Sequence, residues 1–124
     1  MANTDKQTRR SETPASLPKA DPFHEDLPTM VNEHGGKQSQ IPGRFDLIPP
    51  EALALVAIVL HEGAEKYGEN NWKLIDDASH LNHAIRHAFA YLASGEQHHL
   101  SHAACRILFA LHVSIKGVDI HAGS

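Results

Sequence analysis

The feature that most constrains the fold is an unbroken apolar run, ALALVAIVL, at residues 52–60. A helix through this run is apolar around almost its whole circumference, and such a helix is normally buried on several sides. The residues that follow, 61–72, read HEGAEKYGENNW and gather charged and amide side chains at one end of the same helix. These residues therefore predict a helix with a buried first half and a polar, charged last turn.

Proline and glycine residues set the predicted helix boundaries. Proline suits the first turn of a helix, and glycine suits the position just after the last turn. No run alternates with period two for long enough to predict a strand, so the sequence predicts an all-α fold. The predicted helices run from near Pro50 to Gly68, from Asp77 or Ser79 to Gly95, and from about Gln97 to Ile115 before Gly117.

The chain is expected to form one small domain. Residues 1–40 are polar and dotted with proline, so we expect an extended or disordered arm. Residues 41–118 form the predicted all-α domain, and residues 119–124 a short tail. The helices carry apolar stripes that are expected to face inward, namely Leu53, Val56, Leu60 and Ala64, then Leu81, Ile85, Ala88 and Leu92, then Leu100, Ala104, Ile107, Leu108 and Leu111. Because three such helices make a thin core, we expect a second chain to complete the bundle as a homo-oligomer, a dimer or a tetramer.

Composition excludes several classes of protein. The formal net charge of −4 does not fit a nucleic-acid binder, and 6% aromatic residues leave little base-stacking surface. No apolar run approaches the roughly 20 residues that cross a bilayer, so no membrane partner is expected. Cys105 is the only cysteine and no signal peptide is recognisable, so a reducing, cytoplasmic location is expected.

Histidine is unusually frequent, with 11 in 124 residues. Glu62 and Glu65 are three residues apart and share one face of the first helix. The later helices carry further polar stripes, which are His80, His83 and His87 beside Arg86, and then His99 and His102. His61 adjoins Glu62, and the remaining histidines show no periodic pattern; they are His24, His34, His98, His112 and His121.

Facing helices of a bundle supply metal ligands in pairs, and carboxylates suit Mg²⁺ or Mn²⁺ whereas imidazole favours transition metals. Lys66 and Arg86 are placed to contact phosphate. The carboxylate pair or either histidine stripe, taken alone, is also typical of a helix face that contacts solvent or another chain. Trp72 is also typical of an aromatic residue packed in the core. Their coincidence on three successive helices favours a metal-dependent site.

Four segments resemble a known family. GRFDLIPPEAL, GAEKYGENNW, HLNHAIRHAFAYLASGE and HLSHAA, in this order between about Gly35 and Leu111, resemble phage and prophage dATP/dGTP diphosphohydrolases. That family is similar to the MazG-like all-α nucleoside triphosphate pyrophosphatases. The resemblance implies an all-α bundle of that type, completed by oligomerisation, in the cytoplasm of the bacterial host if the chain is phage-encoded.

The resemblance also implies a ligand set. The superfamily carries E-E-x-x-E on one helix and E-x-x-D on a later one, both holding Mg²⁺. Glu62 and Glu65 match the first motif, while His99 and His102 stand where the second has carboxylates. The implied metal ligands are thus Glu62, Glu65, His99 and His102, and the histidines favour Mn²⁺ or Co²⁺ beside Mg²⁺.

The implied activity is hydrolysis of a purine deoxynucleoside triphosphate, dGTP or dATP, to the monophosphate and pyrophosphate, with Glu62 and Glu65 as catalytic residues. Some relatives are expected to supply dGMP for phage 2-aminoadenine DNA. The expected substrate contacts are Lys66, Asn70, Asn71, Trp72, His83, Arg86 and His87.

Two other functions stay open. A histidine-based phosphohydrolase of the HD type needs an adjacent His-Asp pair, and no such pair occurs. The second alternative is a non-catalytic helical module that binds metal structurally or serves as an interaction surface. A structural zinc site usually includes cysteine, and here the single cysteine lies among apolar residues.

Overall fold

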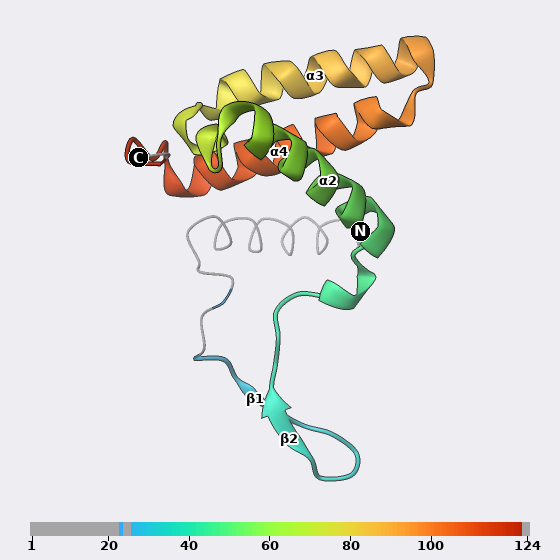
Figure 1. Cartoon of the computed structure of the whole chain (residues 1–124). Coiled ribbons are helices and arrows are strands. Elements are labelled where there is room, and N and C mark those ends of the chain that lie inside the picture. The colour runs from blue at the N-terminus through green and yellow to red at the C-terminus, as the bar shows by residue number, and fades with distance from the viewer. Residues whose placement is uncertain (1–22, 24–25, 123–124) are drawn as a thin grey trace, which may run out of the picture. The chain divides into compact units, whose positions relative to one another are not determined.

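A computed structural model describes residue 23 and residues 26–122 of the chain (Figure 1). The remaining residues of the predicted arm and tail, 1–22, 24–25 and 123–124, lie outside the described residues. The chain divides into two compact units, which meet in sequence between Leu47 and Ile48. The described elements are β1 (Thr29–Val31), β2 (Lys37–Ser39), the 3₁₀ turns η2 (Phe45–Leu47) and η3 (Asn71–Leu74), and the helices α2 (Pro50–Tyr67), α3 (Asp77–Ser94) and α4 (Gln97–Lys116).

The first unit contains a short antiparallel hairpin within the predicted arm. β1 and β2 pair with Met30 opposite Gln38. The Asn32 side-chain oxygen accepts hydrogen bonds from the backbone N–H groups of His34 and Gly36, at 2.9 and 2.8 Å, and so closes the turn. The sequence did not predict these strands, because three-residue strands are too short to show an alternating pattern.

The three predicted helices are present, and the all-α prediction is confirmed. α2 ends before Gly68, whose N–H donates to the Ala64 carbonyl and whose φ of 99° favours glycine. α3 begins one residue after Asp76, which was not a predicted cap. The Asp76 carboxylate accepts a hydrogen bond from the Ser79 N–H at 3.0 Å, and this bond lowers the pKa of Asp76.

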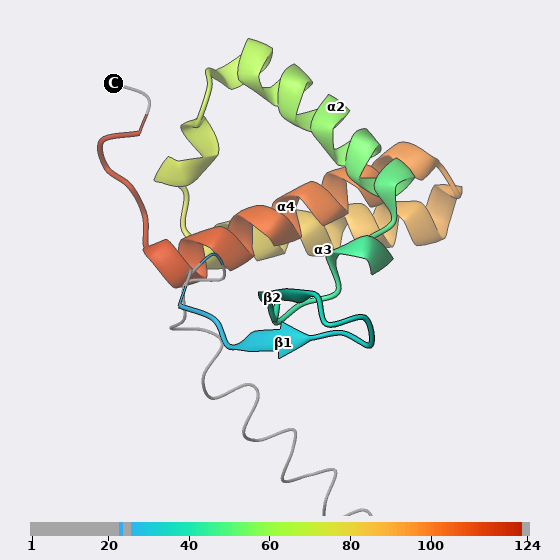
Figure 2. The ribbon, with the colours of Figure 1, turned by 90° about the horizontal axis from the view of Figure 1, so that it is seen from below.

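In the second unit, α3 and α4 form an antiparallel hairpin, and α4 also packs against α2. Figure 2 shows α2 diverging from α4 toward η3, the turn that connects α2 to α3. Small side chains allow the close approach of α3 and α4, since Ala84, Ala103 and Ala110 are all buried. Cys105 is buried among them, and burial raises the pKa of its thiol to about 11. Across the described residues, no helix combines the length and apolar character that a bilayer span requires.

The apolar stripes are less buried than the sequence predicted. Val56 is buried as expected, but Ile85 is 52% exposed and Leu92 is 78% exposed. The buried face of α3 instead carries His80 and Ala84, one residue before the predicted stripe. The physical reason is that α3 has one helix to pack against, so a single chain covers only one edge of a broad apolar face.

His80 is the one fully buried polar side chain among the described residues, with 0% exposure. Its Nε2–H donates to the Trp72 carbonyl at 2.9 Å, and its Nδ1 accepts from Arg106 Nη1 at 3.0 Å. Both contacts require the neutral ring with the proton on Nε2, since a carbonyl only accepts and a guanidinium only donates. The ring therefore ties α3 to the η3 turn and to α4.

Replacing His80 by alanine is expected to destabilise the fold strongly. The H80A variant leaves a buried carbonyl and a guanidinium without partners and opens a cavity, at a cost of about 3 kcal/mol. Urea unfolding followed by circular dichroism measures the change. The control is His61→Ala on exposed α2, where the expected change is within about 0.5 kcal/mol. An H80A chain as stable as the control would contradict the central role of this contact.

Candidate functional site

A cavity of about 890 Å³ lies in the second unit, between the last turns of α2, the η3 segment and the α3–α4 hairpin. Its size falls within the roughly 300–1,000 Å³ typical of small-molecule sites. Every residue that the sequence marked as a substrate contact lines this cavity: Lys66, Asn70, Asn71, Trp72, His83, Arg86 and His87. Segments distant in sequence thus meet around one space.

The cavity wall carries an excess of fixed positive charge. Lys66, Arg86 and Arg106 line it, against the carboxylates of Glu62 and Glu69. Sequence reasoning missed Arg106, which the His80 ring holds at the wall. The available signal was its position four residues after His102, which places both side chains on one face of α4.

Two histidines at the wall, His83 and His87, have lowered pKa values. The charge of Arg106 lowers the pKa of His83, with burial as a smaller cause. Burial, together with the neighbouring His102 and His99, lowers the pKa of His87 to about 4. These rings are neutral at pH 7, so the positive charge at the wall comes from the lysine and the arginines. A site of this kind attracts anions.

His102 is oriented by a contact within its own helix. Its Nδ1–H donates to the His98 carbonyl at 2.8 Å, and a carbonyl cannot donate in return. In the neutral ring Nε2 therefore keeps its lone pair. Since His102 lines the cavity, it is available there as a proton acceptor or a metal ligand.

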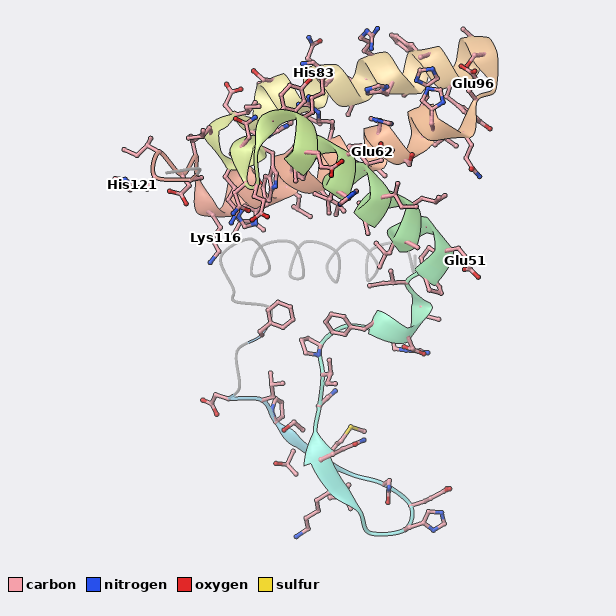
Figure 3. The ribbon with its side chains drawn as sticks, in the orientation of Figure 1. Glu51, Glu62, His83, Glu96, Lys116 and His121 are labelled. Atoms are coloured by element: carbon pink, nitrogen blue, oxygen red, sulfur yellow. The ribbon has the colours of Figure 1, made fainter. Side chains whose placement is uncertain are left out.

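The four predicted metal ligands do not meet as one group. Glu62 and His102 line the cavity, whereas Glu65 is not part of its wall and pairs with His61 at 3.7 Å, with both side chains 72% exposed. His99 lies instead beside Glu96, whose carboxylate is 3.6 Å from His99 Nε2. Figure 3 shows Glu62 on α2 and Glu96 at the turn between α3 and α4.

The donors around the cavity fit a divalent cation that is shared with a phosphate ligand. Mg²⁺ in such sites usually has one or two protein carboxylates and takes its other ligands from water and phosphate. Glu62 and Glu69 supply carboxylates at the wall, Asn70 and Asn71 supply amide oxygens, and His102 supplies a nitrogen. This donor set is mainly oxygen, which suits Mg²⁺ or Mn²⁺.

Trp72 serves as an anchor as well as a wall residue. Its ring stacks on Phe109 with centroids 4.3 Å apart and planes within 5°, and His112 meets it edge-on at 5.0 Å. Lys73 Nζ lies over the ring at 5.5 Å. These contacts fix the η3 turn on α4, and they restrict the part of the indole that a ligand can reach.

Gly63 lies within α2, one turn before its C-terminal end, on the cavity wall. A Cβ built at this position meets nothing within 4 Å, so packing within the chain does not require glycine. Glycine in a helix interior costs about 0.5–1 kcal/mol relative to alanine. A glycine at this position would let a ligand approach the α2 backbone closely, which offsets its lower helix stability.

The His80 ring is expected to stay neutral in the folded chain at pH values at which the same ring is protonated in the unfolded chain. Burial is the main cause that lowers the pKa of His80 below its ordinary 6.5. The folded chain then binds fewer protons than the unfolded chain, so the stability due to neutral His80 is complete above pH 6.5 and declines as the pH falls below it.

Ring-nitrogen NMR spectra of the folded chain test this at pH 7.5 and pH 6. The His80 signals should keep the pattern of the Nε2–H tautomer at both pH values. The urea-unfolded chain, which should be largely protonated at pH 6, is the reference. A protonated His80 in the folded chain at pH 6 would contradict the assigned hydrogen bonds.

Comparison with known proteins identifies the family. The family model described as dATP/dGTP diphosphohydrolase, N-terminal, matches residues 32–122. Comparisons with curated proteins and with solved structures gave no significant match. The match spans all three helices and the cavity between them, and it confirms the resemblance seen in the motifs; the similarity to MazG-like enzymes stays a prediction. The chain belongs to the family of dATP/dGTP diphosphohydrolase N-terminal domains.

Proposed function

We propose that this chain is a metal-dependent pyrophosphohydrolase that converts a purine deoxynucleoside triphosphate, dGTP or dATP, to the monophosphate and pyrophosphate. The observation that carries the proposal is the cavity in which Lys66, Arg86 and Arg106 surround the space beside Glu62. The family name supports the substrate class, because the matched family is described by dATP and dGTP.

The triphosphate is bound mainly by the cationic wall. Arg86 and Arg106 present planar guanidinium groups that match phosphate oxygens in pairs, and Lys66 adds a point charge from α2. The His80 contact fixes Arg106 before the ligand arrives, so less side-chain freedom is lost on binding. These cations also stabilise the negative charge that develops on the phosphate groups during hydrolysis.

Water attack at the α-phosphorus requires a group that accepts a proton. Glu62 and His102 both line the cavity, and a carboxylate oxygen or the Nε2 lone pair of the imidazole is able to accept one. Glu62, with Glu69 or His102, would hold Mg²⁺ or Mn²⁺, and the ion would supply charge neutralisation of phosphate oxygens and activation of water. One water is consumed, the bond between the α- and β-phosphates breaks, and pyrophosphate leaves.

The base end of the substrate lies toward the η3 segment in this proposal. Asn70 and Asn71 carry amide groups with both donors and acceptors, as recognition of a purine edge requires. Asn70 adopts a left-handed backbone conformation, with φ of 65°, which fixes the turn that presents these amides. A dGMP product would suit the supply of a modified-purine pathway in a phage.

We also propose that the protein works as a homo-oligomer. α3 exposes a continuous apolar row, since Leu81, Ile85, Phe89 and Leu92 are between 44% and 78% exposed. These residues recur at helical spacing, so they lie along one side of the helix. A monomer rarely leaves such a face open to water, and a second copy of the bundle would bury it.

A charge placed in the apolar row of α3 is expected to separate the oligomer. The Ile85→Glu variant should sediment as a monomer under conditions in which the wild type sediments as a dimer or tetramer. Analytical ultracentrifugation measures the difference. Ser94→Glu, which is exposed on the side of α3 opposite the apolar row, is the control and should keep the wild-type mass. A monomeric wild type at micromolar concentration would contradict the oligomer proposal.

A product assay tests the reaction. The eight common ribo- and deoxynucleoside triphosphates are incubated with the protein and Mg²⁺ or Mn²⁺, and the products are separated by chromatography. The expected products are a purine deoxynucleoside monophosphate and pyrophosphate, without diphosphate. A diphosphate or nucleoside product would indicate another hydrolase. No product with any nucleotide or metal would favour the non-catalytic module.

Two glutamine substitutions separate the carboxylates of α2. Glu62→Gln is expected to lower kcat by more than about 100-fold, because the wall then lacks a ligand and proton acceptor. Glu65→Gln is expected to lower it less, because Glu65 is outside the cavity wall and pairs with His61. Circular dichroism should show unchanged helix content for both. A fully active E62Q enzyme would overturn the proposed role.

A further inference from the structure

A second polar cluster lies at the turn between α3 and α4. Among the described residues, Glu96, His98 and His99 are the one group of three whose ligand atoms all lie within 4.8 Å of one another. None of these residues lines the cavity. His98 showed no periodic pattern in the sequence. Its ring lies beside that of its sequence neighbour His99, with ring centroids 4.1 Å apart.

From these contacts we infer that Glu96, His98 and His99 form a transition-metal site, of the kind that binds Zn²⁺, separate from the catalytic cavity. Two imidazoles and one carboxylate are a common ligand set for Zn²⁺ in sites with three protein ligands. Such a set is softer than the oxygen-rich wall of the cavity, so the two sites prefer different metals.

The His99 ring has the partner that metal binding through Nε2 requires. His99 Nε2 lies 3.6 Å from a Glu96 carboxylate oxygen, on the ligand side of the ring. On the other side, His99 Nδ1 lies 3.3 Å from His87 Nδ1. A histidine that binds metal through Nε2 carries its proton on Nδ1, and His87 is the acceptor for that proton.

This contact also fixes the ring in place. The His99 side chain is 18% exposed, so packing limits its rotation, while Glu96 is 61% exposed and can adjust to an ion. One fixed and two adjustable ligands would let the site close on a metal without a change in the helices.

The charges around the turn permit a cation. α3 ends at Ser94 and α4 begins at Gln97, so the negative end of one helix dipole and the positive end of the other lie at the same turn. Their partial charges, about half an elementary charge each, largely cancel. The net charge at the turn is then set by the full negative charge of Glu96, which attracts a cation.

Metal titration of the full chain tests the inference. Protein treated with a chelator and then dialysed is titrated with Zn²⁺ by calorimetry and with Co²⁺ by visible absorption. We expect one equivalent to bind, and we expect Glu96→Gln and His98→Ala each to weaken binding by at least about tenfold. Gln97→Ala, which changes the residue between the two ligands, is the matched control and should bind as the wild type does.

The outcomes separate this site from the proposed catalytic one. H98A should retain wild-type hydrolysis of deoxynucleoside triphosphates with Mg²⁺, because His98 does not line the cavity. Zn²⁺ binding by a chain that shows no hydrolysis would still support the metal site, and it would count against the proposed function alone. The inference is overturned if the wild type binds neither Zn²⁺ nor Co²⁺, if E96Q and H98A bind as tightly as the wild type, or if E62Q is the substitution that removes binding.

Discussion

The buried His80 ring is the interaction on which the rest of the second unit depends. It has one proton and one lone pair, and it uses them on the Trp72 carbonyl and on Arg106. The first contact holds the turn that follows α2, and the second holds a cation at the cavity wall. A single neutral ring thus holds two residues of the cavity wall, and its burial favours the neutral form.

The site is built where the bundle is least tightly packed. α3 and α4 approach closely through alanines, whereas α2 contacts mainly α4 and diverges toward η3 (Figure 2). Trp72 and Phe109 stack across this divergence and close one side of it. The polar last turns of α2 therefore line an open cavity. In the apolar half, which the sequence predicted to be buried, Val56 is buried but Leu53, Ile58 and Leu60 are 40–54% exposed, because α4 covers only one side of the helix.

Histidines serve different purposes in this fold, and their surroundings distinguish them. His80 is a core hydrogen-bonding residue, and His83 and His87 are kept neutral at a cationic wall. His102 lines the cavity and is oriented by the hydrogen bond from its Nδ1–H to the His98 carbonyl. His99, beside Glu96 and His98, lies at the far turn of the hairpin. Sequence spacing grouped these residues correctly by helix, but it did not separate their environments.

The sequence by itself determined the helices and one segment of the cavity wall. Prolines and glycines act locally, so the boundaries at Pro50, Gly68 and Gly95 followed from backbone chemistry. The clustering of polar residues at the end of α2 likewise identified the wall from Lys66 to Trp72.

Only the tertiary structure decided which side of each helix is buried and which distant residues meet. The broad apolar face of α3 allowed two neighbouring stripes, and contact with α4 selected the one that carries His80. Arg106 reached the wall through a hydrogen bond to a residue 26 positions earlier, which no local pattern records. Glu65 and His99 lie outside the wall that holds Glu62 and His102, because Glu65 pairs with His61 on the exposed side of α2 and His99 lies beside Glu96 and His87.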